Sequence, residues 1–354
     1  MKILIISQYP NKSNIKDGMF RRINEIDQKL EKNYNRIYFD ISLKKNLKRE
    51  IKKEENLEIY KINFFKDFIF LLSKIKESDV IYIHSLHNYL KIFLIQFFIN
   101  NKKIILDVHG VVAEETEFEN KVKMAKLFEF IEKKLFKKLK KAIFVTEQMK
   151  KFYEKKYPQE MKNIECLILP IIEEKRSKDI EISKNLKIKI KDKIVVIYSG
   201  NLQKWQNIDL MMEKIYKNLS DKFFYIVLTG QKEEMEQKFK EKNISNKYFL
   251  IDSVLPSELS KYYEVSNYGF ILRDDHILNR VANPTKLGEY LDYGIVPIVK
   301  LEEIGDYKEL GYEYITIDKF NDSLPKIKSQ KNIEIMKKYR EKSEKLDFLK
   351  FIED

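Results

Sequence analysis

The feature that most constrains the fold of this chain is a regular alternation between short apolar segments and stretches of helical periodicity. In the first half of the chain the apolar segments are almost free of charge. They comprise residues 2–7, 37–42, 57–62, 79–85, 103–110, 142–147 and 165–170. Strands that are apolar nearly throughout, separated by helical crossovers, predict a parallel sheet covered by helices on both faces.

A second alternation follows a polar stretch that has no core pattern and that we interpret as a hinge. Its strand candidates are 193–200, 223–230, 248–254, 268–274 and 295–300. The length of 354 residues also favours two domains. We therefore expect an α/β fold of two Rossmann-like, doubly wound domains facing each other across a cleft. The predicted boundaries are 1–171 for the first domain, 172–192 for the linker, 193–330 for the second domain and 331–354 for a C-terminal helix that packs back on the molecule.

The composition excludes several classes of protein. Hydrophobic residues make up 44% of the chain and aromatic residues 13%, so the chain is not intrinsically disordered. The apolar runs at 68–72 and 92–99 are too short to cross a bilayer. The first strand lacks the long apolar region and cleavage site of a secretory signal, and Cys166 is the single cysteine, so no intramolecular disulfide can form. We expect a cytoplasmic protein.

The charge is distributed unevenly along the chain. The net charge is +13, of which residues 1–170 carry +12 and the remainder +1. A basic half indicates an anionic partner such as a membrane surface, a phosphorylated substrate or nucleic acid. Nucleic acid is disfavoured because only 8 of the 68 cationic residues are Arg and no known nucleic-acid-binding motif is present.

A lysine-rich helical stretch at 118–157 carries much of this charge. Its apolar stripe comprises Leu127, Phe128, Ile131, Leu135 and Leu139, and lysines 133, 134, 137, 138, 140 and 141 crowd the other side. One interpretation is a solvated helix that covers the core. The other is a helix that docks on anionic lipid, which would place the protein peripherally at the inner face of the plasma membrane.

Doubly wound sheets bind ligands at the carboxyl ends of their strands, so residues in those positions are site candidates. The loop 199–207 contains Gly200, which lets backbone amides approach an anion, and Lys204, which offers a point charge to a phosphate. The alternative is an ordinary strand–helix turn with a solvated lysine.

The most informative segment begins at residue 283. Asn283 is a good N-cap and Pro284 a good first helical residue, so Thr285, Lys286 and Leu287 are predicted to present unpaired amides at a positive helix end. The ammonium of Lys286 adds a full charge to that end. Together these groups predict a diphosphate site.

Glu289 lies one turn further along the same predicted helix. There its carboxylate can accept hydrogen bonds from the two hydroxyls of a ribose. It is also an (i, i+3) neighbour of Lys286, and a surface ion pair between the two is the alternative.

This segment resembles the P-[ST]-K-x-x-E-Y-L-x-x-G-x-P-[VI] pattern of the retaining GT-B glycosyltransferases of the glycosyltransferase family 4 type. The matching residues are Pro284, Thr285, Lys286, Glu289, Tyr290, Leu291, Gly294 and Pro297. The resemblance implies an N-terminal acceptor-binding domain and a C-terminal nucleotide-sugar-binding domain. It implies that Glu289 binds the donor ribose, that Lys286 and the helix end hold the diphosphate, and that Gly200 and Lys204 contribute from the facing loop.

The chain departs from this family pattern in two places. Val281 stands where the family often has the first carboxylate of Glu-x7-Glu, and Asn201 replaces the usual Arg of the loop after the first strand of the second domain. These departures leave the nucleotide and the sugar open, and they also bear on whether the reaction retains the anomeric configuration.

The first domain supplies further candidates. His109 follows a strand and precedes Gly110, and the resemblance places a His there near the donor sugar and phosphate; a structural role is the alternative. Gly18 and the following Arg21 and Arg22 lie in the first loop, which in the family approaches the donor phosphate or the acceptor, but a solvated basic helix start also explains the two arginines.

Four further groups of polar residues flank predicted strands. His84 and His87 are acceptor-side candidates, or ordinary loop residues. For Glu114 and Glu115 we favour helix N-terminal carboxylates over acceptor-side groups.

We expect Arg273 either to contact the transferred sugar or phosphate or to form a buried salt bridge. The cluster Asp274, Asp275 and His276 has metal-ligand chemistry, but consecutive residues rarely point at one centre, so we expect no metal.

The expected function is sugar transfer from a nucleotide-diphosphate sugar to an acceptor hydroxyl of a growing cell-surface polysaccharide or lipid-linked glycan. By the family resemblance the reaction is retaining and needs neither metal nor cofactor, and His109, Lys286 and Glu289 are its catalytic residues. The alternatives are a nucleotide-sugar epimerase or hydrolase of the same fold and a non-catalytic protein that binds anions or nucleic acid.

Overall fold

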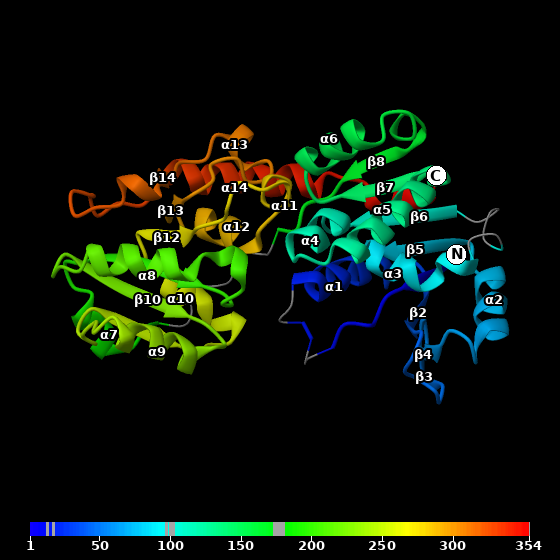
Figure 1. The fold of residues 1–354 in the computed structure, drawn as a ribbon, viewed down its shortest axis with the longest axis horizontal. Coiled ribbons are helices and arrows are strands. Elements are labelled where there is room, and N and C mark those ends of the chain that lie inside the picture. The colour runs from blue at the N-terminus through cyan, green and yellow to red at the C-terminus, as the bar shows by residue number, and fades with distance from the viewer. Residues whose placement is uncertain (12–13, 16–17, 96–97, 99–102, 173–180, 354) are drawn as a thin grey trace. The chain divides into compact units, whose positions relative to one another are not determined.

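The computed structural model describes residues 1–11, 14–15, 18–95, 98, 103–172 and 181–353. The chain divides into two compact units (Figure 1). Unit 1 comprises Met1–Ile171 together with Leu346–Asp354, and unit 2 comprises Ile172–Lys345.

Unit 1 is built on an eight-stranded sheet in the order β3-β4-β2-β1-β5-β6-β7-β8, in which every neighbouring pair is parallel except β3 and β4. The predicted parallel sheet of the first domain is therefore confirmed. The strands are β1 (Lys2–Ile6), β2 (Asn35–Ser42), β3 (Glu50–Glu54), β4 (Leu57–Asn63), β5 (Val80–His84), β6 (Lys103–Val108), β7 (Lys141–Phe144) and β8 (Glu165–Ile168).

The helices of unit 1 pack their apolar faces on this sheet. In the first helix Ile23, Ile26 and Leu30 are fully buried, as their three- and four-residue spacing predicts. The helices are α1 (Gly18–Leu30), α2 (Phe68–Glu77), α3 (Ser85–Ile92), α4 (Val112–Phe118), α5 (Val122–Phe136) and α6 (Glu147–Lys156).

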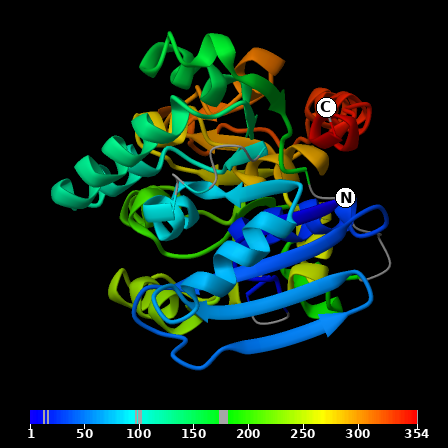
Figure 2. The same cartoon turned by 90° about the vertical axis from the view of Figure 1, so that its right-hand side faces the viewer.

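The antiparallel edge of this sheet was not predicted from the sequence. The segment EIKKE of β3 is exposed at every position and pairs with β4 at the edge of the sheet, the pair seen in blue in Figure 2. A strand whose two faces are both solvated needs no apolar pattern, and charged side chains protect such an edge from pairing with other chains.

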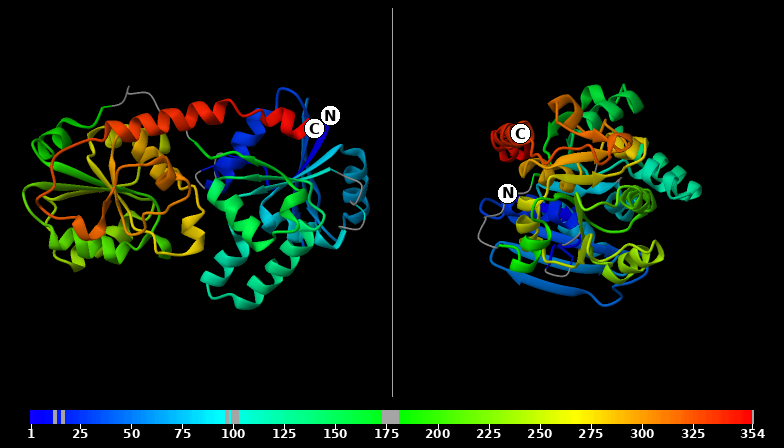
Figure 3. Two further views of the ribbon diagram at one scale, coloured as in Figure 1. Left: turned by 90° about the horizontal axis from the view of Figure 1, so that it is seen from above. Right: turned by 90° about the vertical axis from the view of Figure 1, so that its left-hand side faces the viewer.

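Unit 2 has a six-stranded, wholly parallel sheet in the order β11-β10-β9-β12-β13-β14. Helices lie on both faces of this sheet (Figure 3, left). The strands are β9 (Ile194–Ser199), β10 (Phe223–Leu228), β11 (Phe249–Asp252), β12 (Tyr268–Ile271), β13 (Val296–Val299) and β14 (Ile315–Thr316). The helices are α7 (Lys184–Lys189), α8 (Ile208–Lys217), α9 (Lys232–Glu241), α10 (Leu259–Val265), α11 (Ile277–Arg280), α12 (Thr285–Asp292), α13 (Tyr307–Leu310) and α14 (Gln330–Glu344).

Part of the predicted linker 172–192 belongs to the core of unit 2, so its description as a coreless polar stretch was wrong. The hydroxyl of Ser183 caps α7 by accepting from the amide of Leu186, and the side chains of Leu186 and Ile190 are buried in the apolar core. This short helix has only one narrow apolar face among its lysines, so the sequence pattern did not predict it. Residues 173–180 of the same prediction lie outside the described residues.

The predicted C-terminal helix at 331–354 is two helices. The first, α14, packs on α12 of unit 2 and buries Met336 and Tyr339. The second, α15 (Phe348–Glu353), buries Phe348, Phe351 and Ile352 in the core of unit 1. Among the described residues, the helices are too short or too polar to span a bilayer.

Candidate functional site

The side chain of Lys286, from α12, lies against the loop that follows β9 in unit 2. Gly200 has φ +148, which is costly for any residue with a Cβ, and a Cβ at this position would lie only 2.9 Å from the Nζ of Lys286. The backbone conformation therefore favours glycine here, and the side chain of Lys286 would have to shift to admit a Cβ. The structure brings together the two residues that the sequence assigned to one diphosphate site.

The ammonium of Lys286 is held by uncharged groups. Its Nζ donates to Oε1 of Gln206 at 3.1 Å and lies 4.0 Å from the centre of the Tyr198 ring. Burial, together with the nearby charge of Arg273, lowers the pKa of Lys286 well below its usual range, and the carboxylate of Glu289 only partly opposes this shift. The charged form of Lys286 is therefore costly in this site, and a bound anion would favour it.

The carboxylate of Glu289 is positioned by a chain of hydroxyl groups. The hydroxyl of Tyr263 donates to Oε2 of Glu289 at 2.8 Å, and Oγ of Ser199 lies 2.8 Å from the same tyrosine oxygen. The amide of Ser199 in turn donates to the hydroxyl of Tyr290 at 3.1 Å. Since Ser199, Tyr263 and Tyr290 are buried, this chain fixes the carboxylate in one orientation. The predicted surface ion pair with Lys286 is not the arrangement found, because the two side chains use these other partners.

Tyr290 depends on a glycine that the sequence did not single out. A Cβ at Gly269 of β12 would lie 2.3 Å from the Tyr290 ring. The absence of a side chain there lets the ring approach β12 closely while its hydroxyl accepts from the backbone amide of Ser199.

The start of α12 differs in detail from the prediction. The residue in the capping position is Pro284, and Asn283 is instead buried with its Oδ1 accepting from the hydroxyl of Tyr307 at 2.9 Å. The amide of Leu287 donates to the carbonyl of Pro284 at 3.0 Å, so Leu287 is not one of the open amides. The amides of Thr285 and Lys286 come first in the helix, where no carbonyl of the same helix can pair with them.

The remaining donor-side candidates surround this group. Arg273 follows β12, and its Nη1 donates to Oδ1 of Asn279 at 3.2 Å. Lys204 is exposed in a short 3-10 turn and interacts electrostatically with Asp274.

The three side chains of the cluster at 274–276 have different partners. Asp274 pairs with Lys300, Asp275 makes a bidentate pair with Arg280, and Nδ1 of His276 accepts from the amide of Leu278 at the start of α11. These contacts belong to the local structure around β12 and α11.

Unit 1 contains a buried ion pair that was not predicted from the sequence. Arg22 of α1 donates to both oxygens of Asp107 at 3.1 Å and to the carbonyl of Leu169 at 2.8 Å. Both side chains are almost completely buried. The hydroxyl of Tyr82 adds a third donor to Asp107 at 3.0 Å. The interpretation of the arginines as a solvated helix start is therefore wrong for Arg22.

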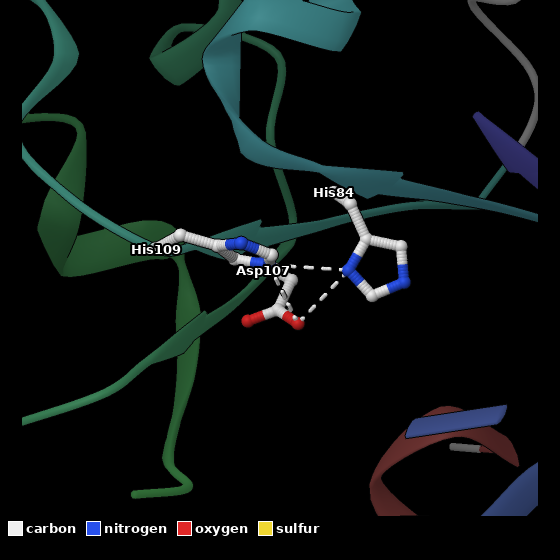
Figure 4. A group of neighbouring side chains, drawn as sticks. All are labelled: His84, Asp107 and His109. Carbon is white, nitrogen blue, oxygen red and sulfur yellow. Dashed lines mark hydrogen bonds and ion pairs between the residues drawn. The ribbon is translucent and has the colours of Figure 1, made fainter. Parts of the chain in front are cut away.

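Two histidines complete this group (Figure 4). Nδ1 of His84 lies 3.1 Å from Nε2 of His109, and each of these nitrogens lies 3.3 Å from Oδ2 of Asp107. His84 is fully buried, whereas the side chain of His109 is 11% exposed. The two histidines, predicted separately as acceptor-side and catalytic residues, thus form one unit.

Burial and the neighbouring charges shift the pKa values of Asp107 and His84 in this cluster. Burial alone would raise the pKa of Asp107, but Arg22 and the histidines hold it well below its usual range. Burial lowers the pKa of His84 to about 4, although Asp107 opposes the shift. At neutral pH the cluster therefore contains one carboxylate, one guanidinium and a neutral His84.

The other acceptor-side candidates lie elsewhere. His87 is on α3, exposed, with its ring edge-on to Phe128 of α5 at 4.9 Å. Gly18 is exposed at the first position of α1, and Nε of Arg21 donates to the carbonyl of Ile15 at 3.4 Å. The structure does not bring these three residues into the histidine cluster.

The preferred interpretation of Glu114 and Glu115 agrees with their position in the first turn of α4. The carboxylate of Glu115 approaches Gly110 so closely that a Cβ there would lie 2.1 Å from its Oε1. Glu114 pairs with Lys156 at 2.6 Å.

A metal ion is the alternative use of the histidine cluster, because His84, Asp107 and His109 offer ligand atoms within 4.8 Å of one another. The donor set fits poorly in its charges. The two oxygens of Asp107 already accept from a guanidinium, which would stand beside any cation bound there. We therefore route no chemistry through a metal.

Comparison with known proteins adds the fold. No family model matches the sequence, and no curated protein matches it. Among solved structures, a trehalose-6-phosphate protein from E. coli bound with UDP-2-fluoro glucose matches with a TM-score of 0.67 and 12% identity over 100% of this chain and 97% of that one. The chain has the GT-B fold. The order of strands and the C-terminal helical segment that were predicted from the sequence agree with this fold.

Two further matches have the same fold. Anabaena HepE in complex with UDP-glucose has a TM-score of 0.61 and 11% identity, covering 97% of this chain and 91% of that one. An α,α-trehalose-phosphate synthase (UDP-forming) from Burkholderia xenovorans, in complex with glucose-6-phosphate, has a TM-score of 0.60 and 10% identity, covering 98% and 93%.

The residues missed by sequence reasoning share a signal. Asp107 is a charged residue inside the otherwise apolar strand of β6, and Arg22 lies on the apolar face of α1 beside Ile23 and Ile26. Charges in such positions are rarely buried unless paired. Looking for opposite charges in apolar patterns would have suggested the pair.

Proposed function

We propose that the protein is a glycosyltransferase that moves a sugar from a nucleotide-diphosphate sugar to an acceptor hydroxyl, and that it is of the retaining family 4 type. The observation that carries the proposal is the arrangement of Lys286 over Gly200 with Glu289 fixed one turn further along α12. A diphosphate and a ribose are the groups that such a cation and such a carboxylate would recognise.

The chemistry follows from the charge that develops on the leaving diphosphate. As the bond from the anomeric carbon breaks, the diphosphate oxygen gains negative charge, and cations already in place stabilise it without reorganisation. The cationic Lys286 and Arg273, with the first amides of α12, supply this stabilisation, and Lys204 offers an exposed charge nearby. We propose that no metal or cofactor is needed.

Unit 1 supplies the group proposed to contact the transferred sugar, His109. We propose that the acceptor is a growing polysaccharide or a lipid-linked glycan. Retention of configuration and the acceptor class rest on the family resemblance alone. The similar structures that hold UDP-glucose or its analogue make uridine diphosphate the first nucleotide to test.

A thermal-shift panel of UDP, GDP, CMP, ADP and dTDP tests the donor site. We expect one diphosphate to raise the unfolding midpoint of the wild-type protein, to do so in the presence of EDTA, and to have a much smaller effect on Lys286→Ala. Lys338→Ala, an exposed lysine on α14, is the matched control and should respond like wild type. A panel in which no nucleotide stabilises the protein would contradict the proposal.

A donor incubated without acceptor separates transfer from the alternatives. A transferase should consume the donor slowly until an acceptor glycan is added. Rapid turnover without acceptor would instead favour an epimerase or a hydrolase. Steeply salt-dependent binding to nucleic acid that does not require Glu289 would favour the non-catalytic alternative.

We also propose that α5 docks on an anionic phospholipid surface, which would place the protein at the inner face of the plasma membrane. Contrary to the predicted stripe, Leu127 is exposed, and so is Phe130. These two side chains share the outer face of α5 with exposed lysines, including Lys126, Lys133 and Lys134. Apolar side chains surrounded by lysines suit a lipid interface with negative headgroups.

Vesicle co-sedimentation tests this docking. The protein should bind vesicles that contain phosphatidylglycerol and not vesicles of phosphatidylcholine alone. The Leu127→Ser/Phe130→Ser variant should lose most of the binding, whereas Ile69→Ser, at a more exposed apolar site on α2, should not. Equal binding by all three proteins would exclude α5 as the docking surface.

A further inference from the structure

The ammonium of Lys286 has its hydrogen-bond partner on a different element of unit 2. Nζ of Lys286, on α12, donates to Oε1 of Gln206 at 3.1 Å, and Gln206 is the last residue of the 3-10 turn that precedes α8. The side chain of Gln206 is buried. Because an ammonium only donates hydrogen bonds, the oxygen of the amide has to face it, and the contact therefore fixes the orientation of the amide.

The backbone that carries Gln206 is held at two points. Its amide donates to the carbonyl of Gln203 at 2.9 Å and closes the 3-10 turn. The next residue, Asn207, has φ +51, a left-handed conformation that asparagine adopts more readily than most residues. Nδ2 of Asn207 donates to the carbonyl of Leu272 at 2.7 Å, directly after β12. The buried side chain of Gln206 thus extends from a fixed backbone toward α12.

The side-chain amide of Gln206 makes a single hydrogen bond within the described part of the chain, the one from Lys286. The turn itself is closed by backbone groups and by Asn207. Replacing the amide of Gln206 therefore changes the surroundings of the Lys286 ammonium and leaves the hydrogen bonds of the turn in place.

The neutral character of this acceptor matters for the charge of Lys286. Burial and the nearby charge of Arg273 disfavour the ammonium and lower its pKa, and the carboxylate of Glu289 opposes them only in part. A carboxylate at position 206 would form an ion pair with the ammonium and raise the pKa of Lys286. It would also cancel the charge that attracts an anion and repel the anion itself. An amide oxygen accepts the same hydrogen bond without either effect.

We infer that Gln206 is a positioning residue, which holds the ammonium of Lys286 beside Gly200 through a neutral acceptor and so leaves its charge for the phosphates of the donor. The ammonium has three N–H groups, of which Gln206 takes one, so two remain for a ligand among the described contacts. For the identity of the anion this inference rests on the proposed function, but for the link between Gln206 and Lys286 it does not.

Acetylation of the nucleotide-free protein tests that link directly. A neutral lysine amine reacts with acetic anhydride and an ammonium does not, so the rate at Lys286, followed by mass spectrometry of its peptide, reports how much of the side chain is deprotonated. Gln206→Glu should lower this rate about tenfold, as a rise of one pKa unit implies. Gln203→Glu adds the same charge at an exposed position of the same turn and should react like wild type. Equal rates for wild type and Gln206→Glu would overturn the inference, even in a protein that binds nucleotide as proposed.

Calorimetric titration with UDP and with uridine tests the consequence for binding. Gln206→Glu should weaken UDP binding by a factor of about ten or more, because the introduced carboxylate opposes the phosphates. Gln206→Met keeps the size of the side chain but removes the acceptor, and it should weaken UDP binding about threefold. Uridine, which has no phosphate, should bind both variants like wild type, and Gln203→Glu should bind both ligands like wild type.

The results separate positioning from a merely structural role. A residue that only supports the turn would affect UDP and uridine alike, and equal losses for the two ligands would overturn the inference. Wild-type affinity of Gln206→Glu for UDP would overturn it as well. A wild-type protein that binds no nucleoside diphosphate, but in which Gln206→Glu slows acetylation of Lys286, would contradict the proposed function and support the link between the two side chains.

Discussion

Each candidate site contains one buried cation, and the two cations differ in their partners and in the direction of their pKa shifts. Arg22 in unit 1 is paired with Asp107, and its pKa is raised although burial alone would lower it. Lys286 in unit 2 donates to an amide oxygen, and its pKa is lowered well below the usual range. The charge of Arg22 is paired within the fold, whereas we propose that the charge of Lys286 is stabilised fully only when an anion binds. A buried cation that is paired with a carboxylate serves the structure, whereas a buried cation that donates only to a neutral group is a candidate for binding an anion.

The largest expected effect concerns the completed pair. Arg22→Met should lower the free energy of unfolding of unit 1 by about 3–5 kcal/mol, because it leaves the carboxylate of Asp107 buried without its partner. Urea unfolding of the intact protein measures the change. The double variant Arg22→Met/Asp107→Leu is the control and should recover much of the loss. Similar stability of wild type and the single variant would break the comparison.

Acidification should weaken unit 1 through His84. Its pKa is about 4 in the folded protein and near 6.5 in the unfolded chain. The unfolded chain therefore binds the proton first, and stability that is complete above pH 6.5 is lost as the pH falls toward 4, by about 3 kcal/mol in total. Urea unfolding across this pH range measures the slope, and His84→Asn should reduce it. Asp107 adds little to the slope above about pH 5, because the stability from its depressed pKa is lost only as the pH falls toward the unfolded value near 3.9 and below it.

The hydroxyl chain that positions Glu289 should contribute a smaller effect. Tyr263→Phe removes the donor to Oε2 and should weaken nucleotide binding by about 0.5–1.5 kcal/mol while leaving the fold intact. Calorimetric titration gives the affinity. Tyr248→Phe, at the residue directly before β11, serves as the control. An unchanged affinity for Tyr263→Phe would show that the orientation of the carboxylate does not matter.

The smallest effect is the one that sharpens the comparison most. Lys286→Met removes a cation that burial disfavours, so we expect it to raise the thermal midpoint of the nucleotide-free protein by about 2–4 °C, equivalent to about 1 kcal/mol. Arg22→Met should do the opposite. A thermal scan of both variants checks the signs, and a clear fall for Lys286→Met would mean that its charge is already satisfied in the fold.

The sequence predicted the two sites unequally, for a physical reason. The unit 2 site was largely predictable, because Lys286 and Glu289 lie one turn apart on one helix and Gly200 ends a recognisable strand. In unit 1 the sequence named His84 and His109 separately, but no spacing relates them to Arg22, which lies 85 positions from Asp107. Such a pair is created only when α1 packs across β6.

The fold was predictable where its pattern is apolar and regular. The buried parallel strands follow from continuous apolar runs. The exposed strand β3 and the short helix α7 were missed because neither has enough apolar residues to produce a period. At the start of α12, Asn283 was assigned to capping from local preference, but the buried hydroxyl of Tyr307 competes for its side chain.

The most direct test of the donor site is a calorimetric comparison of a nucleoside diphosphate with its nucleoside. Lys286→Ala should weaken diphosphate binding by about 1.5–3 kcal/mol and leave nucleoside binding nearly unchanged, since a charge-assisted contact to the phosphates alone is lost. Glu289→Ala should weaken both ligands by a similar amount, because both carry the ribose. Wild-type affinity for the diphosphate in both variants would contradict the assignment of α12 as the donor-binding helix.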